Sequence, residues 1–99
     1  MSILRKIFGL DPKVDYHKLI ANGAILIDVR TPSEYAQGKP ENSTNIPLDK
    51  IESKIDKLKK LNKPIVLCCR SGMRSGHATA IFKKNGIEAY NGGSWNKFA

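Results

Sequence analysis

The chain has 99 residues, enough for one domain with a modest hydrophobic core and too few for a second. Hydrophobic residues make up 40% and charged residues 26%, which is typical of a globular domain and excludes a disordered chain. Lysine and arginine outnumber aspartate and glutamate by 17 to 9, and the resulting charge of +8 favours anionic ligands or partners.

Residues 1–14 are predicted to form an N-terminal extension to a domain of residues 15–99. The first ten residues are too short and too charged for a signal peptide, and no apolar run in the chain is long enough to span a membrane. One helical face of the extension is apolar, with Ile3, Leu4, Ile7 and Phe8. We expect this face to pack on the domain, with no stable membrane association.

In the domain, the apolar pattern and the helix-terminating residues predict that helices and strands alternate. In chain order they are a helix over 16–22, a strand over 24–29, a short helix from Pro32 to Gly38, an extended piece over 45–48, a helix over 49–61, a strand over 65–69, a turn over 70–72, a helix over 75–85, a strand over 87–90 and a terminal helical turn with Trp95 and Phe98.

Caps and periodicity support these boundaries. Thr31 before Pro32 is a typical helix start. Asp49 is predicted to cap the helix over 49–61, and Gly86 is expected to end the helix over 75–85. The helix over 49–61 carries an apolar stripe at steps of three and four: Leu48, Ile51, Ile55, Leu58 and Leu61.

The lysines near this helix are the main concentration of positive charge: Lys50, Lys54, Lys57, Lys59, Lys60 and Lys63. No aromatic residue lies among them, whereas single-stranded nucleic-acid surfaces alternate basic and stacking residues. We therefore expect a solvated helix face and no nucleic-acid partner.

Alternating strands and helices predict a single α/β domain with a mostly parallel sheet and helices on both faces. In such sheets ligands bind beyond the carboxyl ends of the strands. Cys69 follows one buried strand, and the run from Asp28 to Arg30 follows another. The sequence thus predicts that these residues share one edge of the sheet.

The segment around Cys69 carries the strongest chemical signal. The strand delivers the cysteine to a short loop in which Gly72 allows a tight turn into a helix. Backbone N–H groups of the loop and the first helical turn should point toward the sulfur, and Arg70 and Arg74 add positive charge. Such surroundings lower a thiol pKa, so Cys69 is predicted to be a nucleophilic thiolate.

The run Cys69-Arg70-Ser71-Gly72-Met73-Arg74 resembles the active-site loop of the rhodanese family. Three further stretches are similar to other signatures of that family: Asp28-Val29-Arg30 with Glu34, Tyr35 and Gly38; Asn45-Ile46-Pro47-Leu48; and Gly92-Gly93 with Trp95. The resemblance runs from about Asp15 to the C-terminus, and it implies a single rhodanese-like domain.

The resemblance implies a sulfurtransferase in which Cys69 takes a sulfane sulfur from a donor and becomes a persulfide. The backbone amides from Arg70 to Arg74 would hold this persulfide, with Ser71, Gly72 and Met73 between them. Both arginines are candidates for binding a small anionic donor such as thiosulfate. Arg74 is the stronger candidate, since an arginine in the first turn of a helix gains nothing from the helix dipole. The acceptor would be a thiol, cyanide or a protein.

One stretch departs from the family pattern. Where many members have Gly-His-Ile-x-Gly-Ala, this chain has Gly38-Lys39-Pro40-Glu41-Asn42-Ser43. Asparagine tolerates positive φ better than other non-glycine residues, so Asn42 is expected to replace the glycine and to keep the turn.

Other notable side chains have structural interpretations. Cys68 should point away from Cys69, because successive strand side chains face opposite sides of the sheet. Asp28 and Arg30 are candidates for supporting the pocket, but the favoured interpretation is a structural charge network that includes Glu34.

We expect no metal or cofactor, because His17 and His77 lack metal-binding neighbours in the pattern, and Trp95 is assigned to packing. Two adjacent cysteines cannot form a disulfide scaffold, which favours a reducing, cytoplasmic location. We expect a monomer.

Two alternatives remain. A cysteine-dependent phosphatase or arsenate reductase uses the same kind of loop, but a phosphate cradle usually has five residues between cysteine and arginine. Here four separate Cys69 from Arg74, which better suits a single sulfur atom. The other alternative is a rhodanese-like sulfur-carrier or binding module, although inactive domains of that kind commonly lose the cysteine that this chain keeps.

Overall fold

The computed structural model describes residues 14–99, so the predicted packing of the N-terminal extension lies outside the described residues. The elements are α2 (Tyr16–Ala21), β1 (Ile25–Asp28), α3 (Pro32–Gln37), β2 (Thr44–Asn45), a 3-10 turn η1 (Leu48–Lys50), α4 (Ile51–Leu61), β3 (Ile65–Cys69), α5 (Met73–Lys84), β4 (Ala89–Ser94) and a second 3-10 turn η2 (Trp95–Phe98).

The four strands form one sheet in the order β2-β1-β3-β4, and every neighbouring pair is parallel. Parallel neighbours require crossover connections, which the intervening helices provide. The predicted α/β class and parallel sheet are therefore confirmed. In the part of the chain that the structure describes, no helix is long and apolar enough to cross a membrane.

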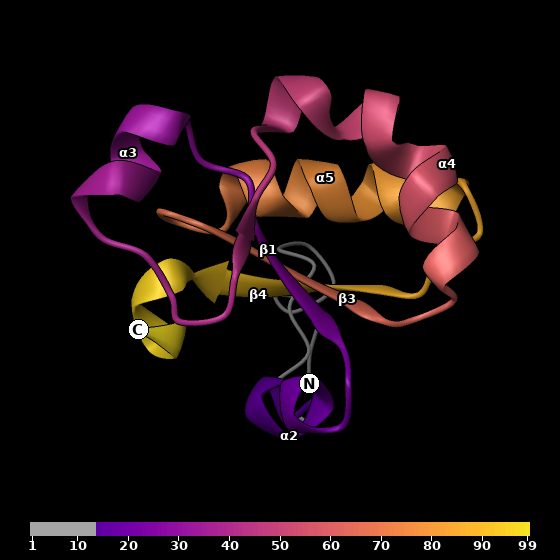
Figure 1. Ribbon diagram of the computed structural model, residues 1–99, viewed down its shortest axis with the longest axis horizontal. Coiled ribbons are helices and arrows are strands. Elements are labelled where there is room, and N and C mark those ends of the chain that lie inside the picture. The colour runs from indigo at the N-terminus through magenta and orange to yellow at the C-terminus, as the bar shows by residue number, and fades with distance from the viewer. Residues whose placement is uncertain (1–13) are drawn as a thin grey trace, which may run out of the picture.

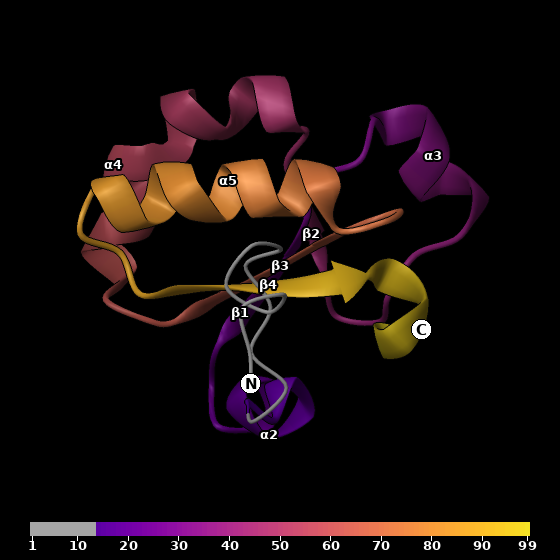
Figure 2. The ribbon, with the colours of Figure 1, turned by 180° about the vertical axis from the view of Figure 1, so that it is seen from behind.

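The sheet is covered on both faces, as Figures 1 and 2 show. On one face α4 and α5 pack Ile55 and Phe82 against a cluster that includes Leu67 of β3. On the other face α2 and η2 cover a smaller cluster around Val66. Because β3 is buried on both faces, its five residues form the continuous apolar run seen in the sequence.

The helix ends agree with the predicted caps in one case and differ in another. Thr31 caps α3 by accepting from the backbone N–H of Glu34, whose carboxylate accepts in return from the Thr31 N–H. The prediction that Asp49 caps α4 was wrong. Asp49 lies inside the turn η1, and α4 begins after Lys50 without a side-chain cap.

The last strand is longer than predicted and continues through both glycines to Ser94. A bulge at Gly92 shifts the pairing, so that Leu67 pairs with Asn91 and Cys68 with Gly93. A Cβ at Gly92 would lie 3.0 Å from a Val66 methyl group and 3.1 Å from the Leu67 carbonyl oxygen, which explains the glycine. The bulge keeps β4 beside β3 as far as Cys69.

Candidate active site

Cys69 lies at the carboxyl end of β3, where the chain turns directly into α5. The turn requires positive φ at Gly72, which has φ +101°. Two backbone N–H groups point at the Cys69 sulfur: that of Gly72 at 3.0 Å and that of Ser75 at 3.4 Å. The Ser75 hydroxyl lies 3.3 Å from the same sulfur. The loop therefore directs several donors at one atom.

These donors control the acidity of the thiol. Burial by itself raises the pKa of Cys69, but hydrogen bonds from the Ser75 hydroxyl and from the backbone N–H groups of Ser75, Gly72 and Ser71 outweigh it. The net effect is a pKa below the ordinary thiol value. A donor set of this kind stabilises a thiolate, which is the form that attacks electrophiles.

The sulfur is enclosed by its loop. Cys69 has no exposed surface, whereas Arg70, Ser71 and Met73 around it are exposed, Met73 to 81%. The Cys69 sulfur therefore has no direct contact with solvent in this conformation of the loop.

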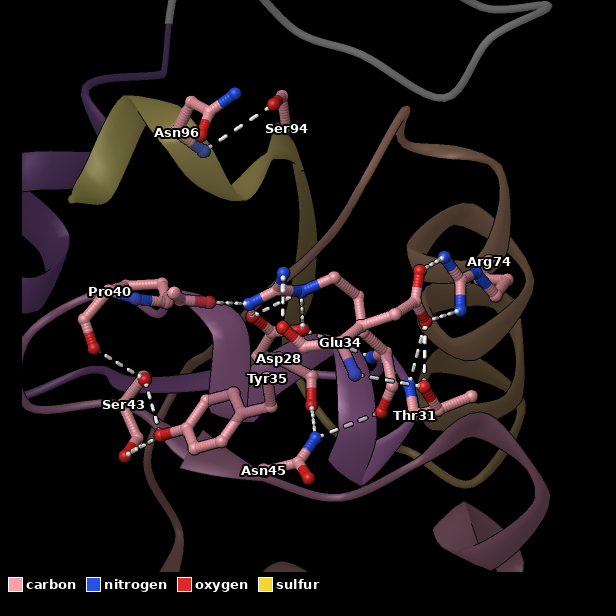
Figure 3. A network of polar contacts seen from close by, with 12 residues as sticks. Asp28, Thr31, Glu34, Tyr35, Pro40, Ser43, Asn45, Arg74, Ser94 and Asn96 are labelled. Atoms are coloured by element: carbon pink, nitrogen blue, oxygen red, sulfur yellow. Dashed lines mark hydrogen bonds and ion pairs between the residues drawn. The ribbon is translucent and has the colours of Figure 1, made fainter.

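The structure separates the two arginines that the sequence analysis groups together. Arg74 forms a two-pronged ion pair with Glu34 of α3, with N–O distances of 2.6 and 3.0 Å (Figure 3). This pairing, together with hydrogen bonds from Thr31, lowers the pKa of Glu34 to about 2. The partner thus accounts for an arginine in the first turn of α5 without a bound anion. Arg70 is exposed and has no ion pair within residues 14–99.

Asp28 and Arg30 form a buried ion pair behind the loop. The Arg30 guanidinium donates to both carboxylate oxygens of Asp28 at 2.7–2.9 Å and to the backbone carbonyl oxygens of Glu34 and Gly38. It also stacks on the ring of Trp95, 4.3 Å from the ring centroid. The expected network therefore exists, but it reaches Glu34 only through the backbone. Arg30 supports the wall of the site and has little capacity left for a ligand.

Two hollows lie beside the loop, and each contains one of its arginines. The first, of about 380 Å³, is lined mainly by polar residues, among them Arg70, Gln37 and Asn96, with Trp95 and Arg30 at its wall. The second, of about 410 Å³, is more apolar and is lined by Arg74, His77, Leu48 and Ile81, among others. Only the first contains an arginine free of an ion pair.

The turn that departs from the family pattern keeps its shape. Asn42 has φ +57°, as predicted for a residue replacing glycine. Ser43 closes the turn by donating to the carbonyl oxygen of Pro40 at 2.7 Å, and the Tyr35 hydroxyl lies 2.8 Å from the Ser43 hydroxyl (Figure 3). The altered residues thus build a stable connection between α3 and β2.

Sequence reasoning missed two residues of the site, Ser75 and Asn91. Asn91 lies on β4, and its side-chain oxygen accepts from the Ser75 hydroxyl at 2.7 Å. Ser75 was detectable, since it follows the loop within the first helical turn. No local sequence pattern marks Asn91 as a site residue, because the pairing of β3 with β4 and the bulge at Gly92 decide where it lies.

Neither of the two histidines considered as metal ligands, His17 and His77, belongs to the loop from Cys69 to Arg74. His17 contacts the backbone carbonyl of Lys97 through its Nε2 atom, and no group of three or more potential metal-ligating side chains occurs within residues 14–99.

A parallel sheet that presents a hydrogen-bonded cysteine on a strand–loop–helix turn defines a class of α/β domains. Within this class the chain belongs to the rhodanese-like domain family, whose model matches residues 13–99. The family predicted from the loop and its companion motifs is thereby confirmed.

Named relatives indicate a sulfurtransferase at the level of the family. A sulfurtransferase of Allochromatium vinosum is 36% identical over 62 residues, covering 63% of this chain and 57% of that protein. A rhodanese with anions from E. coli is 29% identical with a TM-score of 0.70, covering 78% of this chain and 93% of that one. A human single-domain sulfurtransferase is 26% identical with a TM-score of 0.66, covering 85% of this chain and 91% of that one.

The family also contains proteins with other activities. A tRNA uridine(34) hydroxylase of Escherichia fergusonii is 36% identical over 70 residues, which cover 66% of this chain and 20% of that protein. The chain spans between 54% and 60% of the length of three other curated relatives that it matches.

Proposed function

We propose that this protein transfers a sulfane sulfur from a small anionic donor such as thiosulfate to a nucleophilic acceptor through a persulfide on Cys69. The observation that carries the proposal is the convergence of the Gly72 and Ser75 donors on the Cys69 sulfur. A thiolate stabilised in this way is a competent nucleophile toward a sulfur–sulfur bond.

Transfer takes place in two displacements. The Cys69 thiolate attacks the outer sulfur of thiosulfate, an Sγ–S bond forms, and sulfite leaves with the electron pair of the broken bond. An acceptor such as cyanide or a thiolate then attacks the outer sulfur, and the electron pair of the Sγ–S bond returns to Cys69. Neither displacement needs a cofactor or an external oxidant. The loop amides hold the anionic sulfur in both states.

The donor is proposed to enter through the hollow that contains Arg70. This guanidinium is exposed and unpaired within the described residues, so it attracts a dianion, whereas the charges of Arg74 and Arg30 are balanced by carboxylates. The four-residue spacing between Cys69 and Arg74, with Arg74 paired to Glu34, argues against a phosphatase or arsenate reductase. We further propose that the protein acts as a cytoplasmic monomer.

Intact-mass spectrometry tests the proposal. Incubation with thiosulfate should add the mass of one sulfur atom, and cyanide should remove it with formation of thiocyanate. The Cys69→Ser variant should gain no mass, while Cys68→Ala should behave as the wild type. A wild-type chain that remains unmodified by thiosulfate and by a persulfide donor would support the binding-module alternative instead. Hydrolysis of an aryl phosphate, lost in Cys69→Ser, would support the phosphatase.

A further inference from the structure

Asn91 is a buried polar residue that the proposed displacements do not use. It lies on β4 with 2% of its surface exposed and makes three hydrogen bonds. Its Oδ1 atom accepts from the Ser75 hydroxyl at 2.7 Å and from the Gly93 N–H at 3.1 Å, and its Nδ2 atom donates to the Gly72 carbonyl at 3.0 Å. Asn91 therefore connects β4 to the loop and to the nearest hydroxyl of Cys69.

The neighbours of Asn91 fix the orientation of its amide. A reversed amide would place its NH₂ group against the Gly93 N–H and its oxygen against the Gly72 carbonyl oxygen, which are two repulsive contacts. The atom that faces Ser75 is thus always an acceptor. As a consequence, the Ser75 hydroxyl can only donate in this direction.

The Ser75 hydroxyl has a single proton and two acceptors within reach, Asn91 Oδ1 at 2.7 Å and Cys69 Sγ at 3.3 Å. When Cys69 is a thiol, its S–H can donate to Ser75, which donates on to Asn91. When Cys69 is a thiolate, the stronger acceptor is the charged sulfur. When the sulfur carries a second sulfur, its charge has moved outward and Asn91 is again the better acceptor.

We propose that Asn91 is a positioning residue that holds the Ser75 proton while Cys69 is a thiol or a persulfide and releases it to the thiolate. This inference rests in part on the proposed function, because it assigns Ser75 a role in discharging the persulfide. As the acceptor attacks, the Sγ–S bond breaks and its electron pair remains on Sγ. The Ser75 O–H then rotates from Asn91 to Sγ, so no proton leaves the site.

Charged and titratable groups also lie on the elements that surround the loop. They are Asp28 and Arg30 at the end of β1, Glu34 of α3, Cys68 of β3, Arg70 of the loop, Arg74 and His77 of α5, and Lys97 of η2 beside Gly93. Variants of Ser75 and Asn91 leave all of these groups in place, so a comparison among such variants isolates the hydroxyl.

A double-mutant cycle on the Cys69 pKa tests the inference without any sulfur transfer, so its result stands even if the proposed function fails. The pKa is read from the rate of alkylation against pH in a Cys68→Ala background. Ser75→Ala should raise it, because the thiolate loses a donor. Asn91→Ala should lower it, because Ser75 is then free to donate to the thiolate. In a Ser75→Ala background, Asn91→Ala should leave the Cys69 pKa unchanged.

The control is Thr79→Ala, which removes another buried hydroxyl of α5 that donates to the Ser75 backbone carbonyl at 2.7 Å and should leave the Cys69 pKa in place. If Asn91 only braces the loop, its removal should raise the Cys69 pKa equally with and without Ser75. That result would overturn the inference.

Two further measurements avoid any dependence on the folding of the Asn91 variant. In the wild type, the NMR shift of the Asn91 side-chain carbonyl carbon should follow the titration of Cys69, and in Ser75→Ala it should not. Ser75→Ala should also slow discharge of the persulfide to cyanide by about tenfold, while loading at a pH above the thiol pKa is not slowed. Ser75→Thr should restore discharge. Two results would show that Asn91 and Ser75 only support the loop. One is an Asn91 carbonyl shift that does not change as Cys69 titrates, and the other is equal slowing of persulfide loading and discharge in Ser75→Ala.

Discussion

Cys68 and Cys69 are neighbours in the chain, yet they lie in opposite environments. The Cys68 side chain is packed with Ala24, Leu26 and Val66 on the face covered by α2 and η2. Burial, and the nearby charge of Asp28, raise the pKa of Cys68 far above its ordinary value. Cys69 is equally buried, but its pKa is lowered.

The comparison of Cys68 with Cys69 shows that burial alone does not decide whether a cysteine is reactive. Both thiols have no exposed surface. What separates them is the supply of hydrogen-bond donors, because backbone N–H groups of the turn donate to the Cys69 sulfur, whereas Cys68 lies among apolar side chains. A strand places adjacent side chains on opposite faces, and only one face of β3 leads into the loop.

Replacement of each cysteine should give the largest contrast. Cys69→Ser should abolish sulfur transfer, because a serine hydroxyl is not ionised at neutral pH and cannot form a persulfide. Cys68→Ala should retain most of the activity. Thiocyanate formation from thiosulfate and cyanide measures both, with circular dichroism as a check on folding. Comparable loss in the two folded variants would mean that the thiols act together.

The two loop arginines should differ in donor capture. Arg70→Ala should raise the thiosulfate KM by about tenfold and make it less sensitive to salt, since it removes an exposed charge-assisted contact. The matched control removes the other arginine together with its partner, as Arg74→Ala/Glu34→Ala, and keeps the net charge. It should change KM much less. A larger rise of the thiosulfate KM in the double variant than in Arg70→Ala would assign donor binding to Arg74.

The opposite pKa shifts of the cysteines should appear in the pH dependence of stability. Cys68 keeps its proton in the folded state after the unfolded thiol, of pKa about 8.5, has lost it, so it reduces the free energy of unfolding as pH rises above that value. The slope for this group approaches about 1.4 kcal/mol per pH unit.

Urea unfolding between pH 8 and 10 should therefore show a steeper loss for the wild type than for Cys68→Ala. Cys69 has the opposite sign, because its folded-state pKa is lowered. Its stabilising contribution is present above the unfolded thiol pKa and declines as pH falls toward the folded one. Equal slopes in the wild type and Cys68→Ala would contradict the environment assigned to Cys68.

The smallest expected effect concerns the ion pair that holds α3 beside the loop. The pKa of Glu34 falls from 4.5 to about 2 through its hydrogen bonds with Arg74 and Thr31. A carboxylate with a lowered folded-state pKa stabilises the protein above pH 4.5 and loses that contribution as the pH falls toward 2. Glu34→Gln should therefore flatten the acid dependence of the melting temperature, by a small amount because the pair is exposed to solvent. An unchanged acid profile would show that the pair contributes nothing to stability.

Much of this architecture was predictable from local patterns. Apolar runs identified β1 and β3 because both are buried on two faces, and Thr31 with Pro32 identified the start of α3. The loop from Cys69 to Arg74 was recognisable because the strand, the glycine and the helix start are consecutive in the chain. For the same reason, strand alternation correctly placed Cys68 on the face opposite Cys69.

Contacts between distant segments were decided only by the tertiary structure. Crossover connections bring Glu34 to Arg74 across 40 positions and Asn91 to Ser75 across 16. No local propensity records such pairs, since each depends on which strands become neighbours and on the register between them. The bulge at Gly92 sets that register for β4. The sequence alone therefore determined which residue is the nucleophile candidate, and the packing of β3, α5 and β4 decided which groups control its proton and which arginine remains free.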